Sequence, residues 1–349
     1  EAGLIAQAPV PTDLPYLELE LALALGMAEY RRKTGIPRFT LALSGGRDSS
    51  MVALLVARGL RYSFPDDSAE QAAERVGRHL TTAYLATELS GDATRSAAAG
   101  LARELGAKHL EVGIQPAFDL HVRLSEQLTG NPLSWDDPKD DLTLQNVQAR
   151  LRGSLIWMVA NQENGLLLST SNKSEAAVGY ATMDGDTSGG LSPIADVPKS
   201  MVTAYLVWAA RFHGLDSIAQ VVATPAMAEL RPADRNQTDE GDLMPFAVLD
   251  RLMYGFVQLG QSPLELFRSL WPAMDERYNG DATAFAAHVR KFVVLLCRAQ
   301  WKRERFAIAF RVTSFDLDPK TGFRFPPVQA PFTEELAEMD AYVQSLAGS

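Results

Sequence analysis

Short apolar segments of strand length alternate with longer segments of helical periodicity along the first half of the chain. Compact apolar runs bounded by turn residues are typical of buried strands, and apolar residues that recur every third or fourth position are typical of helices. The predicted strands are 38–43, 81–86, 109–113 and 165–169, and the predicted helices near them are 51–57, 92–106 and 144–161. This alternation predicts an α/β protein with a doubly wound parallel sheet.

The remaining segments have other patterns. A helix is predicted at 16–34, where the periodicity ends at a glycine, a typical helix stop. Residues 1–15 are rich in Pro and Ala and are predicted to form an arm or linker, and the chain after Met201 is predicted to be largely helical. The polar stretches 128–141 and 182–198 are predicted to be loops near a site, because functional loops emerge at the carboxyl ends of parallel strands.

The composition is that of an ordinary globular protein and argues against several classes of function. Of the 349 residues, 46% are hydrophobic and 22% are charged, which fits one large α/β domain with a helical extension or two small domains. The net charge of −10 argues against nucleic acid as the main partner. No apolar run approaches the ~20 residues of a membrane span, and no signal peptide is recognised, so no membrane partner is expected.

The single cysteine, Cys297, lies in an apolar segment. One cysteine forms neither an intrachain disulfide nor a cysteine-based zinc site, which suits a reducing compartment. We therefore expect a cytoplasmic protein in which Cys297 is a buried core thiol. The five histidines are scattered without ligand spacing and are predicted to be structural or solvated.

The predicted strand at 38–43 is followed at once by Ser-Gly-Gly-Arg-Asp-Ser at 44–49. Glycine amides at the start of a helix approach an anion closely, and the helix dipole favours phosphate. Ser44 and Ser49 add hydroxyl donors, and an acid such as Asp48 beside phosphate implies a bridging Mg²⁺. The loop is not a Walker A sequence, because no Lys follows the second glycine at the required place. A plain tight turn is the alternative interpretation.

This loop resembles the pyrophosphate loop of the N-type ATP pyrophosphatases, a superfamily that adenylates a substrate oxygen and releases pyrophosphate. The block 166–202 is similar to the NAD synthetase segment in which a strand ends in Thr-x-Asn-Lys-Ser-Glu and continues to Gly-Tyr, Gly-Asp, Pro-Ile and a Lys-x-x-Val helix. The further blocks 146–153, 229–250, 300–305 and 323–326 are similar to segments of the family. Their order along the chain resembles the synthetase domain of the family's longer bacterial members.

The resemblance implies an adenine nucleotide alpha hydrolase-like domain at 16–330, followed by a tail at 331–349. It also implies a ligase that forms a carbon–nitrogen bond. The nicotinate carboxylate of deamido-NAD attacks the α-phosphate of ATP, pyrophosphate leaves, and ammonia then displaces AMP to give NAD. ATP is the implied co-substrate and Mg²⁺ the implied cofactor. The family habit of a homodimer makes the helix at 16–34 a candidate contact.

Roles for single residues follow from the motif matches. The implied ATP-binding residues are Ser44, Gly45, Gly46, Asp48, Ser49, Thr170 and Lys199, the implied Mg²⁺ ligands are Asp48 and Glu175, and the implied substrate-binding residues are Arg150, Asp186 and Lys302. The implied catalytic residues are Asp48, Lys199 and Asp186. Mg²⁺ and Lys199 would stabilise charge on the phosphorus oxygens, and Asp186 would accept a proton from ammonium or hold that cation. Without the motifs, such charged residues are more often solvated or salt-bridged.

Five positions depart from the family pattern. Ser169 stands where a glycine is common, and shorter members have Lys, Asp, a small hydroxyl residue and His at the positions of Met183, Gly190, Met227 and Trp301. Contacts at the last four positions are therefore not carried over to this chain. Longer members share some of these differences, which argues for a subclass.

The nitrogen source is left open by the sequence. Many longer members carry an upstream glutamine amidohydrolase domain with a Glu-Lys-Cys set, and this sequence, which starts at Glu1, contains none. Free ammonia, or ammonia delivered by a glutaminase domain or partner, is therefore expected. Three alternative functions are a tRNA-modifying enzyme, a non-catalytic adenine-nucleotide-binding module and a silent subunit of a complex. A tRNA-modifying enzyme would require a basic surface and reactive cysteines. A non-catalytic module would lack Glu175 and the lysines at 199 and 302.

Overall fold

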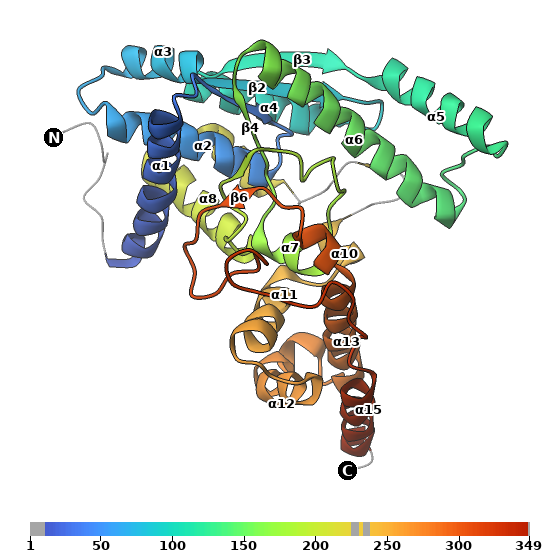
Figure 1. Ribbon diagram of the computed structural model, residues 1–349. Coiled ribbons are helices and arrows are strands. Elements are labelled where there is room, and N and C mark those ends of the chain that lie inside the picture. Colours follow the sequence, from blue (N-terminus) through green and yellow to red (C-terminus); the bar gives the residue numbers. More distant parts are fainter. Residues whose placement is uncertain (1–10, 225–229, 233–237, 348–349) are drawn as a thin grey trace.

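The computed structural model describes residues 11–224, 230–232 and 238–347, and within them the chain forms one six-stranded sheet with helices on both faces (Figure 1). The strands are β1 (Phe39–Ala42), β2 (Leu80–Ala86), β3 (Lys108–Gly113), β4 (Leu166–Leu168), β5 (Leu191–Ser192) and β6 (Ile308–Ala309). Their order is β3-β2-β1-β4-β5-β6, and every neighbouring pair is parallel. The predicted doubly wound parallel sheet is confirmed.

Both faces of the sheet are buried, as an all-parallel sheet requires. Successive side chains of a strand point to opposite faces, so Tyr84 and Leu168 join one hydrophobic cluster while Leu85 and Leu167 join another. The first cluster is built with α1 (Leu14–Thr34), α2 (Arg47–Ser63), α3 (Ala69–His79), α4 (Asp92–Leu105), α8 (Lys199–His213) and α9 (Asp216–Ala223). The second is built with α5 (Gln115–Thr129) and α6 (Pro138–Gln162).

A third hydrophobic cluster forms the helical region that extends below the sheet in Figure 1. Its helices are α7 (Lys173–Val178), α11 (Phe246–Met253), α12 (Pro263–Met274), α13 (Ala282–Arg298) and α15 (Thr333–Ala347). Cys297 is a free, buried thiol in this cluster, as predicted. The segment 331–349, predicted as a tail, contains α15, whose Leu336 and Met339 are buried in the same cluster.

The remaining elements are short. They are η1 (Pro11–Asp13), α10 (Asp239–Asp242), η3 (Tyr254–Gln258), η4 (Glu276–Tyr278) and α14 (Gln300–Arg303). Of the predicted N-terminal arm, the described residues belong to η1 and the start of α1, and Asp13 is buried there with its Oδ1 accepting a hydrogen bond from Trp208 Nε1 at 3.0 Å. The face that α1 buries packs within the chain, and its role as a dimer contact stays a prediction.

One predicted loop is shorter than expected, because both of its ends are helical. Helix α5 runs to Thr129 and α6 begins at Pro138, so only 130–137 connects them instead of 128–141. The reason lies in the chemistry of helix starts. Asp137 caps α6 by accepting a hydrogen bond from Lys139 N at 2.9 Å, and proline is well tolerated in the first helical turn.

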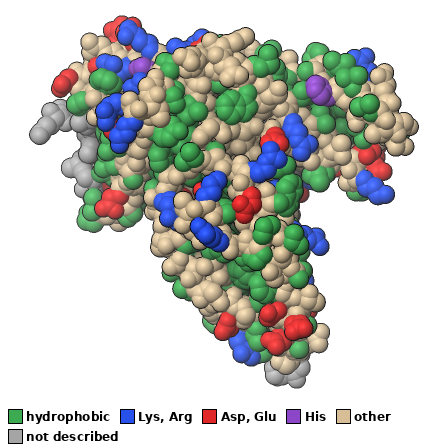
Figure 2. All heavy atoms as spheres, in the orientation of Figure 1, with side chains coloured by type: hydrophobic (Ala, Val, Ile, Leu, Met, Phe, Trp, Pro, Cys, Tyr) green, Lys and Arg blue, Asp and Glu red, His purple; other side chains and the backbone are tan. Residues whose placement is uncertain are grey.

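The outer surface carries charges of both signs. Lys and Arg side chains are interspersed with Asp and Glu on the face drawn in Figure 2, without a large area of one sign. Across the part of the chain that the structure describes, every helix is too short or too polar to cross a membrane.

Candidate active site

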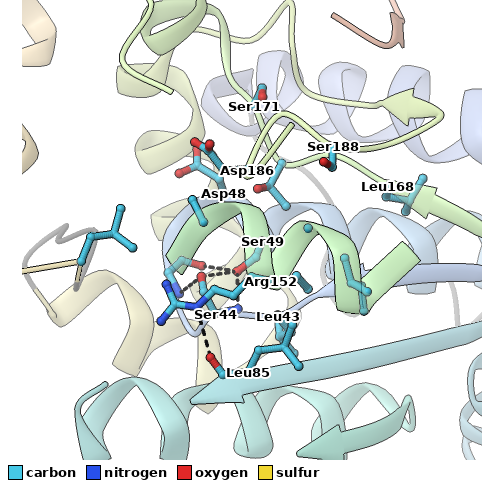
Figure 3. Close-up of a pocket in the computed structure, with 18 of the residues that line it drawn as sticks. Leu43, Ser44, Asp48, Ser49, Leu85, Arg152, Leu168, Ser171, Asp186 and Ser188 are labelled. Atoms are coloured by element: carbon cyan, nitrogen blue, oxygen red, sulfur yellow. Dashed lines mark hydrogen bonds between the residues drawn. The ribbon is translucent and has the colours of Figure 1, made fainter. Parts of the chain in front are cut away.

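A pocket of about 260 Å³ opens where β1 and β4 lie side by side (Figure 3). From β1 the chain proceeds outward to β2 and β3, and from β4 it proceeds the other way to β5 and β6. In open parallel sheets, ligands bind at such a switch point, beyond the carboxyl ends of the strands. The loop after β1, the segment after β4 and one face of α6 all line this pocket.

The loop after β1 has the conformation of an anion site. Gly45 has a φ of +77°, and a Cβ there would lie 2.1 Å from the carbonyl oxygen of Thr94, so only glycine fits. Ser44 Oγ accepts a hydrogen bond from Gly46 N at 3.2 Å and lies 3.1 Å from Ser49 Oγ, as Figure 3 shows. Gly46 is the N-cap of α2 and has no side chain that could accept hydrogen bonds from the first amides of the helix. The amino end of α2 lies at the pocket, where these amides can bind an anion.

A buried lysine lies between two acids at the centre of the pocket. Lys199, the first residue of α8, donates hydrogen bonds from Nζ to Asp48 on α2 and to Glu175 Oε1 on α7, the latter at 2.8 Å. Asn172 Nδ2 holds the other oxygen of Asp48 at 3.0 Å. A third acid, Asp239, lines the same pocket and is 7% exposed, and its Oδ1 has no partner among the described residues. Acids therefore outnumber the cation in this buried centre.

Burial and neighbouring charges shift the pKa values of Lys199, Glu175 and Asp239. Burial alone would lower the pKa of Lys199, but the charges of Asp48 and Glu175 raise it well above its ordinary value, so the lysine stays protonated. Burial raises the pKa of Glu175, and Asp48 adds to this while Lys199 opposes it. Burial also raises the pKa of Asp239, opposed by Lys199. Two of the acids thus hold a proton more readily than usual, because one ammonium does not balance the ionised forms of all three.

The donor set fits a Mg²⁺ ion that arrives with phosphate. Among the residues whose positions are described, no three His, Cys, Asp or Glu side chains are grouped to hold a metal by themselves. Mg²⁺ commonly binds one or two carboxylates together with substrate phosphates instead of an all-protein cage. The surplus of buried negative charge and the unpartnered oxygen of Asp239 are what such a cation would neutralise.

Asp186 lies on the pocket wall in the loop between α7 and β5 (Figure 3). Its side chain is exposed on that wall, where the surrounding protein partly desolvates it and raises its pKa to about 6, against the hydrogen bond that Thr182 N donates to its Oδ1 at 2.6 Å. A carboxyl with a pKa in this range is mostly ionised at neutral pH. Its pKa is also close to the working pH, which is the condition for efficient proton transfer. The loop therefore presents a group suited to acid–base chemistry.

Two basic residues predicted to bind substrate do not line the pocket. Lys302 Nζ donates to the carbonyl oxygens of Gly179 and Ala181, each at 2.7 Å, and so supports the loop that carries Asp186. Arg150 is exposed and donates from Nε to the carbonyl oxygen of Met183 at 3.2 Å. The substrate roles of both residues stay predictions.

The structure thus brings most of the predicted site together. The predicted residues that line the pocket are Ser44, Gly46, Asp48, Ser49, Thr170, Glu175, Asp186 and Lys199. Sequence reasoning missed Arg152 and Asp239, which also line it, and Asn172, which holds Asp48. The helical spacing in α6 offered a signal for Arg152. Residues 149, 152, 153 and 156 share one face of this helix, and all four line the pocket. Arg150 is not on this face.

The departures from the family pattern have local explanations in two cases. A Cβ at Gly190 would lie 2.4 Å from Cδ1 of Leu166, so the leucine side chain takes the space of a larger residue. Ser169 is buried, and its Oγ lies 3.2 Å from Ser171 Oγ. Trp301 is half-exposed beside Lys302, and Met227 lies outside the described residues.

A phosphate loop and a buried acid–lysine centre at the switch point of a parallel sheet are typical of α/β proteins that bind nucleotides. The family model of NAD synthase matches residues 21–278, and the chain belongs to this family. This match confirms the predicted family.

Similar proteins agree with this assignment. The chain is 34% identical over 318 residues to the glutamine-dependent NAD(+) synthetase of Synechocystis sp., a match that covers 90% of this chain and 49% of that protein. It is 35% identical over 310 residues to that of Thermotoga maritima, with coverages of 88% and 47%. The crystal structure of a glutamine-dependent NAD(+) synthetase from Cytophaga hutchinsonii has a TM-score of 0.82 at 34% identity, over 93% of this chain and 56% of that chain. The chain spans about half the length of the curated relatives it matches.

Proposed function

We propose that this chain catalyses the synthetase reaction of NAD formation, the ATP-dependent amidation of deamido-NAD. The observation that carries the proposal is the protonated Lys199 held between Asp48 and Glu175 beside the loop at 44–49. This arrangement suits a reaction that builds negative charge on phosphate oxygens. The names of similar proteins supply the reaction class.

The chemistry runs in two steps. An oxygen of the nicotinate carboxylate attacks the α-phosphorus of ATP, and the bond from that phosphorus to the bridging oxygen breaks, which releases pyrophosphate. Ser44, Ser49 and the amino end of α2 bind the phosphates, while Lys199 stabilises the charge that develops on them. Mg²⁺, when bound by Asp48 and Glu175, supplies further neutralising charge.

In the second step, ammonia attacks the acyl carbon of the adenylate, its nitrogen releases one proton to solvent, and the bond to the AMP oxygen breaks, which leaves the amide and AMP. Ammonium must lose a proton before its nitrogen is a nucleophile. Asp186, ionised at neutral pH, accepts this proton at its carboxylate. Ammonia enters from solution or is delivered by a glutaminase domain or partner, in line with the names of the similar proteins.

The apolar part of the pocket has the chemistry to bind the adenine ring. Leu85, Ile156 and Leu167 belong to one hydrophobic cluster and line this side of the pocket. Arg152 lies beside them, and its Nε donates to the carbonyl oxygen of Leu85 at 3.1 Å (Figure 3). Nucleotide pockets commonly combine an apolar slot with a few fixed polar groups.

A tRNA-modifying enzyme of the same superfamily is disfavoured by its own chemical needs. Such an enzyme would want a reactive cysteine, and burial raises the pKa of Cys297 to about 11, which keeps this thiol protonated. Cys297 also lies in the core of the helical region, away from the residues that line the pocket.

The test is turnover by the purified chain with ATP, Mg²⁺, ammonium and deamido-NAD, following NAD, AMP and pyrophosphate together. NAD and AMP in equal amounts support the proposal. Pyrophosphate release only with another acceptor would overturn the substrate assignment, and no release with any acceptor would overturn the enzyme assignment.

A variant tests the role of the first acid. Asp48→Asn is expected to lower turnover by ~100-fold or more, because the carboxylate's charge toward Lys199 and Mg²⁺ is lost while the shape is kept. The matched control is Asp340→Asn, whose carboxylate pairs with Arg290 in the helical region. Near-normal turnover of Asp48→Asn, with an unchanged fold by circular dichroism, would refute the Mg²⁺ role.

A further inference from the structure

Asp250 on α11 does not line the pocket at the switch point. It contacts two serines, each of which is adjacent in sequence to a residue at the centre of that pocket. Its Oδ1 accepts a hydrogen bond from Ser174 Oγ, and its Oδ2 accepts one from Ser200 Oγ and another from Ser200 N at 3.1 Å. Ser174 precedes Glu175 on α7, and Ser200 follows Lys199 on α8. One carboxylate therefore joins the two segments whose side chains meet in the site.

These contacts also cap α8. The residue at its N-cap, Pro198, has no side-chain oxygen, so the first amides of the helix need partners from elsewhere. Lys199 N donates to Ser174 Oγ at 2.8 Å, and Ser200 N donates to Asp250. A carboxylate at the amino end of a helix is also favoured by the helix dipole. The cap of α8 is thus provided by α7 and α11.

The anchor of Asp250 is rigid. Its neighbours Leu249, Leu252 and Met253 are fully buried in the hydrophobic cluster of the helical region. The backbone of Asp250 therefore moves only with that core, and three hydrogen bonds hold its side chain. The helical region holds the beginnings of α7 and α8 at a fixed separation.

We propose that Asp250 is a positioning residue, which sets the 2.8 Å contact between Lys199 Nζ and Glu175 Oε1 by tying α7 to α8. The inference rests on the proposed function, because it assigns Lys199 and Glu175 to the adenylation step. Misplacement of reacting groups by about 1 Å lowers rates by ~100-fold. Loss of the tie is therefore expected to reduce adenylation more than nucleotide binding.

The test compares two acids that hold opposite ends of α8, the partly buried Asp250 and the buried Asp13. Asp250→Asn removes the charge at the start of the helix, whereas Asp13→Asn weakens the contacts of Trp208 and Arg211 near its end. For Asp250→Asn we expect kcat for pyrophosphate release to fall by ~10–100-fold, a several-fold higher Mg²⁺ concentration for half-maximal activity, and a KM for deamido-NAD within about threefold of the native value. For Asp13→Asn we expect a lower melting temperature with kcat and Mg²⁺ dependence unchanged.

Equal behaviour of the two variants, with only the melting temperature altered, would overturn the positioning role. If Asp250→Asn does not fold, Ser200→Ala serves instead, because it removes one hydroxyl donor and keeps the backbone donor. A shift in Mg²⁺ dependence in that variant supports the proposal, and unchanged kinetics overturn it.

Failure of the proposed function is recognised separately. If the native chain releases no pyrophosphate, the function fails, and the positioning role is judged by the Mg²⁺ concentration that gives half-maximal ATP binding in calorimetry. A several-fold higher Mg²⁺ requirement for Asp250→Asn but not for Asp13→Asn supports the role, and equal requirements overturn it.

Discussion

Replacing Glu175 by glutamine should make the unliganded protein more stable while it removes activity. Asp48 and Glu175 share one ammonium, that of Lys199, so one buried negative charge has no full partner. The glutamine side chain would keep the shape and an acceptor oxygen for Lys199 but carry no charge. The structure therefore predicts a gain in the free energy of unfolding from a substitution in the centre of the site.

The size of this gain follows from the pKa of Glu175, which burial raises above its ordinary value of 4.5. Each pKa unit of such a rise opposes folding by ~1.4 kcal/mol once the pH exceeds the raised value. The net rise already includes the opposing effect of Lys199, and glutamine keeps only a neutral hydrogen bond to that ammonium, so we expect Glu175→Gln to add about 1–3 kcal/mol at neutral pH. A group with a raised folded-state pKa loses stability as pH rises from its unfolded pKa, so the gain should vanish near pH 4 and grow toward neutrality.

Glu20 is the matched control, because it is a second buried glutamate with the opposite balance of charge. Burial would raise its pKa, but His213 and Arg58, with a hydrogen bond from Tyr62, lower it to about 2. This lowered pKa contributes stability above pH ~4.5 that is lost as the pH falls toward 2. Glu20→Gln leaves its partners uncompensated and should cost about 3–5 kcal/mol at pH 7.

Thermal and urea unfolding of the unliganded variants at pH 4.5 and pH 7.5 measures both effects. The expected result is a melting temperature for Glu175→Gln that exceeds the native value at pH 7.5, and one for Glu20→Gln that lies below it. A lower melting temperature for Glu175→Gln at pH 7.5 would refute the charge imbalance inferred for the centre. Activity provides the second readout, since loss of this Mg²⁺ ligand should lower turnover by ~100-fold or more.

Three further outcomes are expected. Gly45→Ala should destabilise the protein by at least ~1–2 kcal/mol and weaken ATP binding in calorimetry, since its Cβ would meet the Thr94 carbonyl oxygen at 2.1 Å with a positive φ. The turnover rate of the native chain should increase with pH through about pH 6, as Asp186 ionises. Asp186→Asn should lose this increase, and an unchanged increase in the variant would contradict a base at this position. Arg152→Ala should raise the dissociation constant for ATP severalfold while Arg150→Ala leaves it unchanged, and equal effects would show that pocket lining does not separate these arginines.

Much of the fold was predictable because buried parallel strands are nearly continuous apolar runs. The central strands β1, β2 and β4 have such runs, and the helices between them have clear periodicity. Strands β5 and β6 escaped prediction because two residues are too few to show a pattern. Helix α5 was missed, and the start of α6 misplaced, because prolines in a polar context resemble turns although each occupies the first helical turn here.

The site divides in the same way. The loop at 44–49 was predictable because glycine, hydroxyl and acid stand in a short span between a strand and a helix. Asp239 carries no such local signal, and the helical spacing of Arg152 shows only which face of α6 it occupies, so the roles of both depend on how distant segments pack around the pocket. The contact of Lys199 with Asp48 joins residues 151 positions apart, which only the sheet order brings together.

That separation has a consequence for the order of events during synthesis. The phosphate loop leaves the ribosome long before its counter-ion, because 151 positions separate Asp48 from Lys199. Until then the acid has no ammonium beside it, although β4, which flanks β1 on that side, precedes Lys199 in the chain. The nascent first half of the chain therefore holds a phosphate loop without this counter-ion. We expect tight nucleotide binding only after α8 has joined the sheet.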